Sequence, residues 1–288
     1  MSPPISIDRS PMKDLQHYKY ISPFQPDYLE GRQTYWLERF PPVLQRRASQ
    51  LATSPRDLAT QAALAMHERQ FGVTKRFLSL AGEVAAAVCV ASFRTGDVSF
   101  TYGGVPMTGP GAVPEIVLSP TEWRTSFDLV ILSRRPDLIR AVLDYPEEYL
   151  RRDPGERDEY GFTLVETMRA FGLGQARWKD LALETERNME PERIRIAPAN
   201  WLAMERGRLG LMRAIDTGSA AELDAALVAM IKAHKAYYGR GAEAKKPGGL
   251  LCLPALAFAA MAHDRGIRTS VVSDYMPLWL VRGEDPPA

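Results

Sequence analysis

Residues 248–267 read GGLLCLPALAFAAMAHDRGI, and a short β-like run follows them into Ser273-Asp274-Tyr275-Met276-Pro277. The letters between Leu250 and Ala262 are apolar on every side of a helix, and such a helix must be buried. The helical signals elsewhere in the chain are amphipathic. We therefore expect a mostly all-α fold, in which antiparallel helix pairs pack around a buried C-terminal helix, with a minor β element near the C-terminus.

Helix start signals recur along the chain and support this expectation. Ser54-Pro55-Arg56-Asp57 combines an N-cap serine with proline at the first helical position. Ser119-Pro120-Thr121-Glu122 and Ser219-Ala220-Ala221-Glu222 both have the spacing of a capping box. We expect Gly72 to end the helix that starts at Ser54, and a strongly apolar helix over 77–93 to pair with it.

The region from Gly96 to Leu118 departs from the helical pattern. Residues 98, 100 and 102 alternate as in a strand, Gly103-Gly104 follows, and three prolines lie in 106–114. We interpret the region as a long ordered loop that holds at most a short strand. The predicted domain division is an extended arm over 1–26 and a single helical domain over 27–288, with a subdivision within 95–119 as the alternative.

Composition and charge are those of a globular protein of 288 residues, with 45% hydrophobic and 25% charged residues. The net charge of +1 argues against a nucleic-acid-binding surface. Cys89 and Cys252 lie in apolar helical contexts and are expected to be buried thiols in a reducing compartment. No signal peptide is recognisable, and Leu250–Ala262, the most apolar stretch, is shorter than the roughly 20 residues of a membrane span. We expect a cytoplasmic protein with no membrane partner.

The histidines lack partners at metal-ligand spacing. They are His17, His67, His234 and His263. His67-Glu68 begins like a zinc-protease motif, but Phe71 stands where the second histidine is needed. His263-Asp264 is similar to the dipeptide of metal-dependent phosphohydrolases, which need further ligands that are not recognisable here. We expect no metal and no cofactor.

No catalytic constellation is recognisable either. The chain has neither a nucleophile elbow nor a glycine-rich phosphate loop. His234 lies on an apolar helical stripe, where a hydrogen-bonded core residue is the favoured interpretation over a catalytic base. His263-Asp264 fits the end of a helix, where a basic group favours the dipole and Gly266 supplies the cap. We therefore expect no catalytic residue.

Residues 144–160, the acidic segment, carry seven acids and three arginines with interleaved tyrosines. A solvated surface is one interpretation. The other is a binding face for a basic protein partner, because acids steer association and aromatics anchor it. The candidate partner-binding residues are Tyr145, Glu147, Glu148, Tyr149, Asp153, Glu156, Asp158, Glu159 and Tyr160. The loop Gly103–Pro114 is a second candidate surface.

The C-terminal pattern resembles the immunity protein 49 family of bacterial polymorphic toxin systems. The resemblance covers about the last sixty residues, which include the apolar helix over 253–260. The matching residues are His234, Tyr237, Tyr238, Gly248, Gly249, His263, Asp264, Gly266, Asp274, Tyr275 and Pro277. These residues look structural, since they supply turns, a buried helix and an aromatic–proline corner. They indicate a family without indicating a binding site.

The resemblance implies a cytoplasmic antidote that is encoded beside a toxin used in bacterial competition, for example by type VI secretion. It would bind its cognate toxin stoichiometrically and would not be an enzyme. A helical protein-binding scaffold or regulator is the alternative. A metal-dependent helical hydrolase built from His67, His263 and Asp264 is a third, weaker hypothesis.

Overall fold

A computed structural model describes residues 5–7, 27–111, 118–152, 155 and 157–287. Most of the expected arm over 1–26 therefore lies outside the described residues. The chain divides into two compact units. The C-terminal unit comprises residues 1–30, 59–77 and 198–288, and the central unit comprises 31–58 and 78–197. No boundary falls within 95–119, and the expected single domain over 27–288 stays a prediction.

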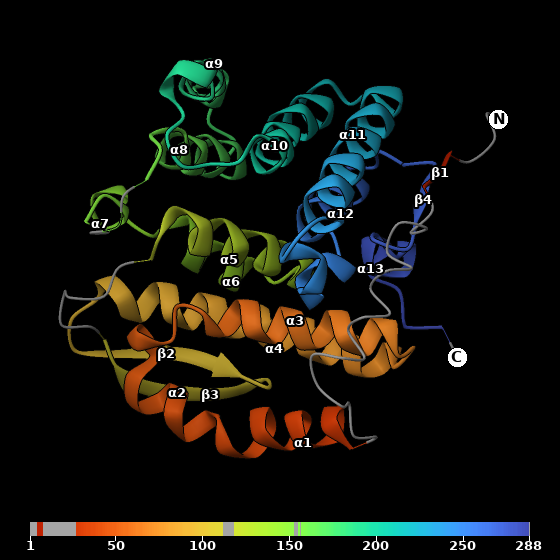
Figure 1. Ribbon diagram of the computed structural model, residues 1–288. Coiled ribbons are helices and arrows are strands. Elements are labelled where there is room, and N and C mark those ends of the chain that lie inside the picture. The colour runs from red at the N-terminus through yellow and green to blue at the C-terminus, as the bar shows by residue number, and fades with distance from the viewer. Residues whose placement is uncertain (1–4, 8–26, 112–117, 153–154, 156, 288) are drawn as a thin grey trace. The chain divides into compact units, whose positions relative to one another are not determined.

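The described residues are mostly helical, which confirms the predicted all-α class (Figure 1). The C-terminal unit contains α10 (Ala199–Thr217), α11 (Ala220–Tyr238), α12 (Leu253–Asp264), α13 (Leu278–Arg282) and the strands β1 (Ile5–Ile7) and β4 (Val271–Ser273). The central unit contains α2 (Pro41–Arg47), β2 (Asp97–Tyr102), β3 (Val105–Pro110), α5 (Pro120–Ser133), α6 (Pro136–Leu143), α7 (Glu147–Leu150), α8 (Tyr160–Gly172) and α9 (Trp178–Asn188). Three helices contribute residues to both units, namely α1 (Tyr28–Thr34), α3 (Ser54–His67) and α4 (Phe71–Phe93).

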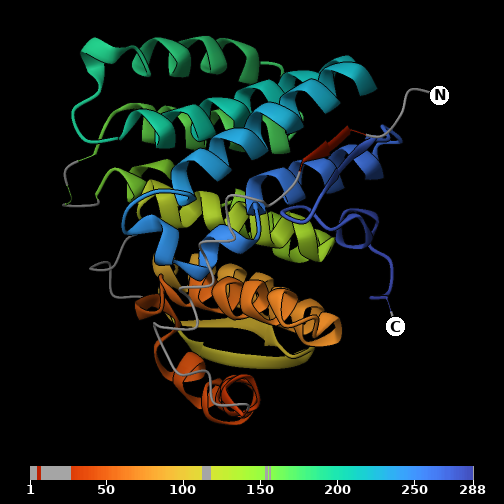
Figure 2. The ribbon, with the colours of Figure 1, turned by 45° about the vertical axis from the view of Figure 1, so that its right-hand side comes forward.

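The C-terminal unit is built around α12, as the sequence predicts. Residues 254–260 of α12 are all buried. Helices α10 and α11 lie side by side in Figures 1 and 2 and are joined by Gly218, which has φ +72°, and the N-cap Ser219. The Ser219 hydroxyl accepts a hydrogen bond from the Glu222 backbone N–H at 3.2 Å. The Glu222 carboxylate accepts from Thr217 Oγ1 at 2.8 Å, so this pair makes only the first half of the expected box.

Helix α12 ends at His263-Asp264, so the interpretation of this dipeptide as a helix terminus is confirmed. Gly266 has φ +83°, a conformation that favours glycine. Its N–H donates to the His263 carbonyl, and the Ile267 N–H donates to the Ala262 carbonyl, both at 2.9 Å. This pair of bonds is a Schellman cap, which satisfies carbonyls that the helix leaves open.

The prediction of a long loop over 96–118 is wrong for residues 97–110, because these residues form a β-hairpin (Figures 1 and 2). Gly103 and Gly104 have φ +59° and +77°. Positive φ at both central residues defines the type I′ turn, whose twist matches that of paired strands. The alternation over 98–102 followed by Gly-Gly already indicated this hairpin. The expected C-terminal β element is β4, which pairs in parallel with β1.

Both prolines of β3 occupy positions that do not break the hairpin. Pro106 lies opposite Thr101, and Pro110 lies opposite Asp97. Because Tyr102 and Val105 flank a two-residue turn, their pair exchanges hydrogen bonds, and the 101–106 and 97–110 pairs fall at the alternate, non-bonded positions. Proline lacks an N–H, so the missing donors are on the outer edge of β3.

Two expectations about α3 and α4 need correction. Helix α3 ends at His67 rather than at Gly72, because Arg69 takes up φ +58° and the Gln70 N–H bonds to the Ala65 carbonyl at 2.8 Å. The stretch 250–262 is also not the segment of the chain that comes closest to a membrane span in length and composition. Helix α4, with 23 residues, is long and apolar enough to span a membrane by length and composition, but 78% of its most apolar window is buried, as is typical of a core helix.

Candidate functional site

Three of the nine residues predicted to bind a partner are buried in the central unit. The Tyr145 side chain is fully buried, and its hydroxyl accepts a hydrogen bond from the Leu118 N–H at 3.2 Å. Its ring contacts the rings of Phe93 and Tyr149 edge to face. Tyr160, the first residue of α8, is 5% exposed. Neither ring can anchor a partner from these positions, so the structure assigns both tyrosines to the core.

Asp158 is the third buried residue, and its carboxylate accepts backbone hydrogen bonds from the segment that follows α9. Its Oδ1 accepts from the Arg195 N–H at 2.7 Å, and its Oδ2 accepts from the N–H groups of Ile196 at 3.2 Å and Ala197 at 2.9 Å. A carboxylate that receives several backbone N–H groups is well compensated for burial. The expected surface role of Asp158 is therefore corrected to a structural one. Asp153 and Glu156 lie outside the described residues.

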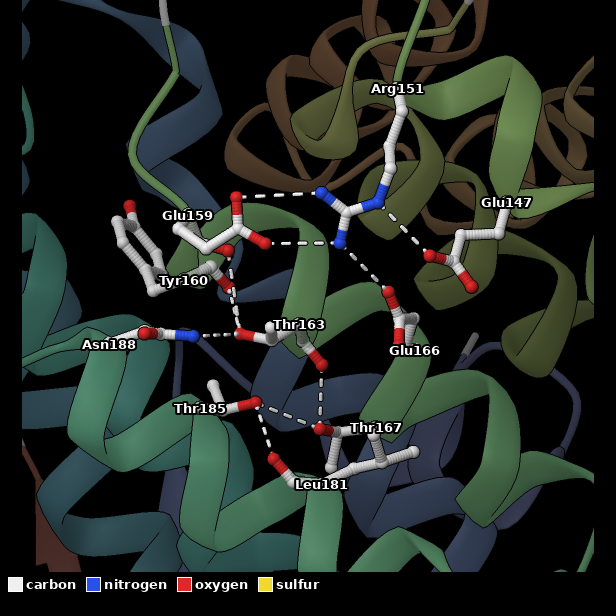
Figure 3. A network of polar contacts seen from close by, with 10 residues as sticks. All are labelled: Glu147, Arg151, Glu159, Tyr160, Thr163, Glu166, Thr167, Leu181, Thr185 and Asn188. Carbon is white, nitrogen blue, oxygen red and sulfur yellow. Dashed lines mark hydrogen bonds and ion pairs between the residues drawn. The ribbon is translucent and has the colours of Figure 1, made fainter.

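Glu147 and Glu159, together with Glu166 of α8, surround the guanidinium of Arg151, as Figure 3 shows. Arg151 Nε donates to Glu147 Oε1 at 3.0 Å, and Arg151 Nη2 donates to Glu159 Oε1 at 3.0 Å and to Glu166 Oε1 at 3.2 Å. We call these four residues the Arg151 network. It joins α7, the residue after it, the residue before α8, and α8 itself. A planar guanidinium with several fixed N–H groups suits such a junction better than an ammonium.

The Arg151 network perturbs its own carboxyl groups in opposite directions. A hydrogen bond with Glu166, helped by Arg151, lowers the pKa of Glu147 below its usual range. Burial, together with the neighbouring Glu147, raises the pKa of Glu166 to about 7. Glu166 is the least exposed of the three acids, at 17% against 42% for Glu147 and 53% for Glu159. Desolvation and a nearby like charge both favour the neutral acid, which explains why the pKa of Glu166 is the one that is raised.

A buried row of hydroxyls and an amide continues inward from the Arg151 network between α8 and α9 (Figure 3). Thr167 Oγ1 lies 2.9 Å from Thr185 Oγ1, and Asn188 Nδ2 donates to Thr163 Oγ1 at 3.4 Å. Thr167 and Thr185 also reach the carbonyls four residues earlier, at 2.7 and 2.8 Å. The two hydroxyls have two protons for these three contacts, so one contact lacks a proton at any moment.

The acidic segment keeps a smaller surface than the sequence predicts. Glu148 is exposed, and Tyr149 is half-buried beneath Arg152, whose guanidinium carbon lies 4.2 Å from the ring centroid. Together with Glu147 and Glu159, these residues leave a compact acidic surface around α7. Of the seven predicted residues that the structure describes, four therefore remain available to a partner: Glu147, Glu148, Tyr149 and Glu159.

The second predicted surface, Gly103–Pro114, is the turn and outgoing strand of the hairpin, and its last residues lie outside the described ones. Its turn is held by Glu83 of α4, a residue that the sequence analysis missed. The buried Glu83 carboxylate accepts from the N–H groups of Gly103 and Gly104 and pairs with Arg135 Nη1 at 2.7 Å. The only signal for Glu83 was a lone acid inside an apolar helical run. Val105, next to the turn, is 61% exposed.

The family-motif residues converge in the C-terminal unit. We call the group formed by His234, Tyr238, Gly249 and Tyr275 the motif cluster. His234 Nε2 lies 3.0 Å from the Gly249 carbonyl oxygen, and its ring centroid lies 4.6 Å from that of Tyr238 and 5.4 Å from that of Tyr275. A Cβ added at Gly249 would lie 2.7 Å from Tyr238 Cγ, so only glycine fits. The interpretation of His234 as a hydrogen-bonded core residue agrees with this geometry.

Other motif residues surround the motif cluster or lie apart from it. The Tyr237 ring packs on that of Trp201 at 5.1 Å, and Pro277, which precedes α13, is buried. Gly248 has room for a Cβ, and Asp274 is exposed.

No metal-ligand set is found among the described residues, where no three side chains of His, Cys, Asp and Glu are grouped suitably. His263 instead has its Nε2 2.6 Å from Arg268 Nη1 and its Nδ1 3.5 Å from Asp264 Oδ1. His67 is exposed at the end of α3. The residues named for the hydrolase hypothesis are therefore not assembled into a centre in that part of the chain.

The comparisons with known proteins address the family directly. No curated protein and no solved structure matches the chain. A family model described as Immunity protein 49 matches residues 73–280. The match therefore includes the hairpin, the Arg151 network and the motif cluster, and extends far beyond the C-terminal sixty residues that carry the resemblance in sequence. The chain belongs to the immunity protein 49 family.

Proposed function

We propose that this protein neutralises a cognate bacterial toxin by binding it stoichiometrically, without turnover, in the cytoplasm. Family membership over residues 73–280 is the observation that carries the proposal. An antidote that acts by occlusion needs a stable interface, which buries about 1,200–2,000 Å² in total. Nanomolar affinity corresponds to about −12 kcal/mol. The toxin is proposed to be the product of the adjacent gene.

The acidic surface around α7 is the proposed contact for this toxin. Glu147, Glu148 and Glu159 offer negative charge there, and Tyr149 offers an aromatic ring that Arg152 already covers in part. Such a surface favours a partner with a basic face, since complementary charge accelerates association. Arg151 fixes two of these acids in place, which lowers the entropy that binding would otherwise cost.

The test of the function is co-expression. Bacteria expressing the adjacent gene product alone should lose viability, and co-expression of this protein should restore growth. The two purified proteins should then elute together at equal stoichiometry. A neighbour that is harmless alone and does not bind would overturn the proposal.

The test of the surface is the substitution Glu148→Lys. Glu148 is exposed and outside the Arg151 network, so its reversal changes charge by two units while leaving those ion pairs intact. We expect slower association and weaker protection at low ionic strength, an effect that salt reduces. The matched control is Glu184→Lys on α9, which is also an exposed helical acid. Equal association rates for both variants would remove α7 from the interface.

A further inference from the structure

The Arg151 network contains more negative charge than its arginine balances. Three carboxyl groups meet one guanidinium, so the fully ionised group has a net charge of −2. Arg151 uses Nε for Glu147, both terminal nitrogens for Glu159, and Nη2 again for Glu166. Its guanidinium carbon lies 5.0 Å from the centroid of the Phe162 ring. The guanidinium therefore presents its N–H edges to acids and leaves no edge to balance the remaining charge.

The charges around Glu166 come from each segment of the Arg151 network. Glu147 approaches from α7, Arg151 from the residue after α7, and Glu159 from the residue before α8. Arg169 on α8 is the next cation, and it favours the ionised form of Glu147. Both cations favour an ionised Glu147, whereas burial opposes ionisation of Glu166.

We propose that Glu147 and Glu166 share one proton, and that this proton makes the Arg151 network a pH-sensitive latch that holds α7 on α8 below neutral pH and loosens above it. In the closed latch, protonated Glu166 donates a hydrogen bond to ionised Glu147, and the Arg151 network has a net charge of −1. Loss of the proton removes that bond and places two carboxylates against each other.

The direction of the pH dependence follows from the two carboxyl groups. Burial and Glu147 raise the pKa of Glu166 to about 7, so the stabilisation due to its proton is complete below its ordinary range and is lost as pH rises through about 7. The pKa of Glu147 is lowered, so its ionised form persists well into the acidic range. Between these limits the pair holds one proton, and the latch is closed.

The size of the effect follows from the same linkage. With Glu166 titrating near pH 7 in the closed latch and near its ordinary value in the open one, the opening equilibrium rises about tenfold between pH 6 and pH 8. The latch is a property of the isolated chain and does not depend on the toxin.

Two measurements on the full-length protein test the proposal. Carbon-13 NMR of the glutamate carboxyl groups should show Glu166 titrating near pH 7. Hydrogen exchange of the amides in 147–152 and 157–163, corrected for intrinsic rates, should show protection that falls about tenfold from pH 6 to pH 8.

The variant Glu166→Gln provides the decisive comparison. Glutamine keeps a donor for Glu147 and has no charge, so protection should be the same at pH 6 and pH 8. Glu148→Gln on α7, outside the Arg151 network, should retain the wild-type pH dependence. Glu147→Gln removes the competing carboxylate and should move the Glu166 titration to lower pH. Titration of Glu166 near 4.5 in the wild type, or unchanged pH dependence in Glu166→Gln, would overturn the latch.

Discussion

The motif cluster of the C-terminal unit and the Arg151 network of the central unit are organised by different forces. His234 is surrounded by the half-buried ring of Tyr238, the buried ring of Tyr275 and the backbone carbonyl of the buried Gly249. Arg151 is surrounded by carboxyl groups, and its side chain is 41% exposed. Shape holds the first group together and charge holds the second. We therefore expect changes of volume to damage the motif cluster, and changes of pH or salt to act on the Arg151 network.

The largest predicted effect is that of Gly249→Ala in the motif cluster. The new Cβ would lie 2.7 and 2.8 Å from Cγ and Cβ of Tyr238, atoms too close to the backbone to move aside. Overpacking of this kind costs about 2–3 kcal/mol in the free energy of unfolding. Urea denaturation measures it. Gly248→Ala is the matched control, because its Cβ would meet only the Tyr238 hydroxyl at 3.6 Å, and equal losses in both variants would contradict the argument.

The next effect concerns Asp158→Asn, which tests the buried part of the acidic segment. The amide NH₂ would face backbone N–H groups that the second carboxylate oxygen now accepts. Leaving buried donors without an acceptor should reduce the free energy of unfolding by about 2 kcal/mol. Asp180→Asn, an exposed acid on α9, should change it by less than about 0.5 kcal/mol. If Asp158→Asn left the free energy of unfolding unchanged, the interpretation of Asp158 as a surface acid would be restored.

A smaller effect is expected for Thr185→Val between α8 and α9. The isosteric valine removes one hydroxyl, but Thr167 can still donate to the Thr163 carbonyl at 2.7 Å. Since the two hydroxyls never satisfied all three contacts, the loss should be about 1 kcal/mol or less, measured by thermal unfolding. A loss above about 2 kcal/mol would show that the Thr167–Thr185 contact contributes more than this proton count allows.

The smallest effect is that of Arg151→Lys. A lysine ammonium lacks the planar fork of N–H groups that bonds to all three acids in the wild type. Partly exposed ion pairs contribute little, however, so the free energy of unfolding at neutral pH should fall by only about 0.5 kcal/mol. This loss should shrink further in 1 M salt. The cost of Gly249→Ala should not change with salt. If salt altered both variants equally, the distinction between shape and charge would fail.

The sequence predicts the local features of the fold well. The capping box at Ser119 forms with both hydrogen bonds, and the apolar run over 253–262 becomes the buried α12, since caps and helix burial follow from spacing within a few residues. The hairpin at 97–110 was underpredicted, although its alternation and Gly-Gly turn were visible. The end of α3 was misplaced because Arg69, rather than a glycine, takes the left-handed conformation.

The candidate site was only partly predictable because burial depends on residues far apart in sequence. Nothing near Asp158 indicates that the N–H groups of residues 195–197 will meet its carboxylate. Glu83 reaches a turn about twenty residues away, and the alternation of acids with arginines over 144–160 does not distinguish an ion-pair network from a free acidic surface. Pairing with Glu166, which lies outside that segment, decides the electrostatics of the whole group.

Pro106 and Pro110 have a consequence for how this protein behaves at high concentration. An open strand edge is a template on which other chains add by backbone hydrogen bonding, and it is a common origin of aggregation. Along the outer side of β3, these two prolines remove two of the three outward donors that such addition needs, and Thr108 keeps the third. We therefore expect this edge to be a poor template for strand addition between copies of the chain.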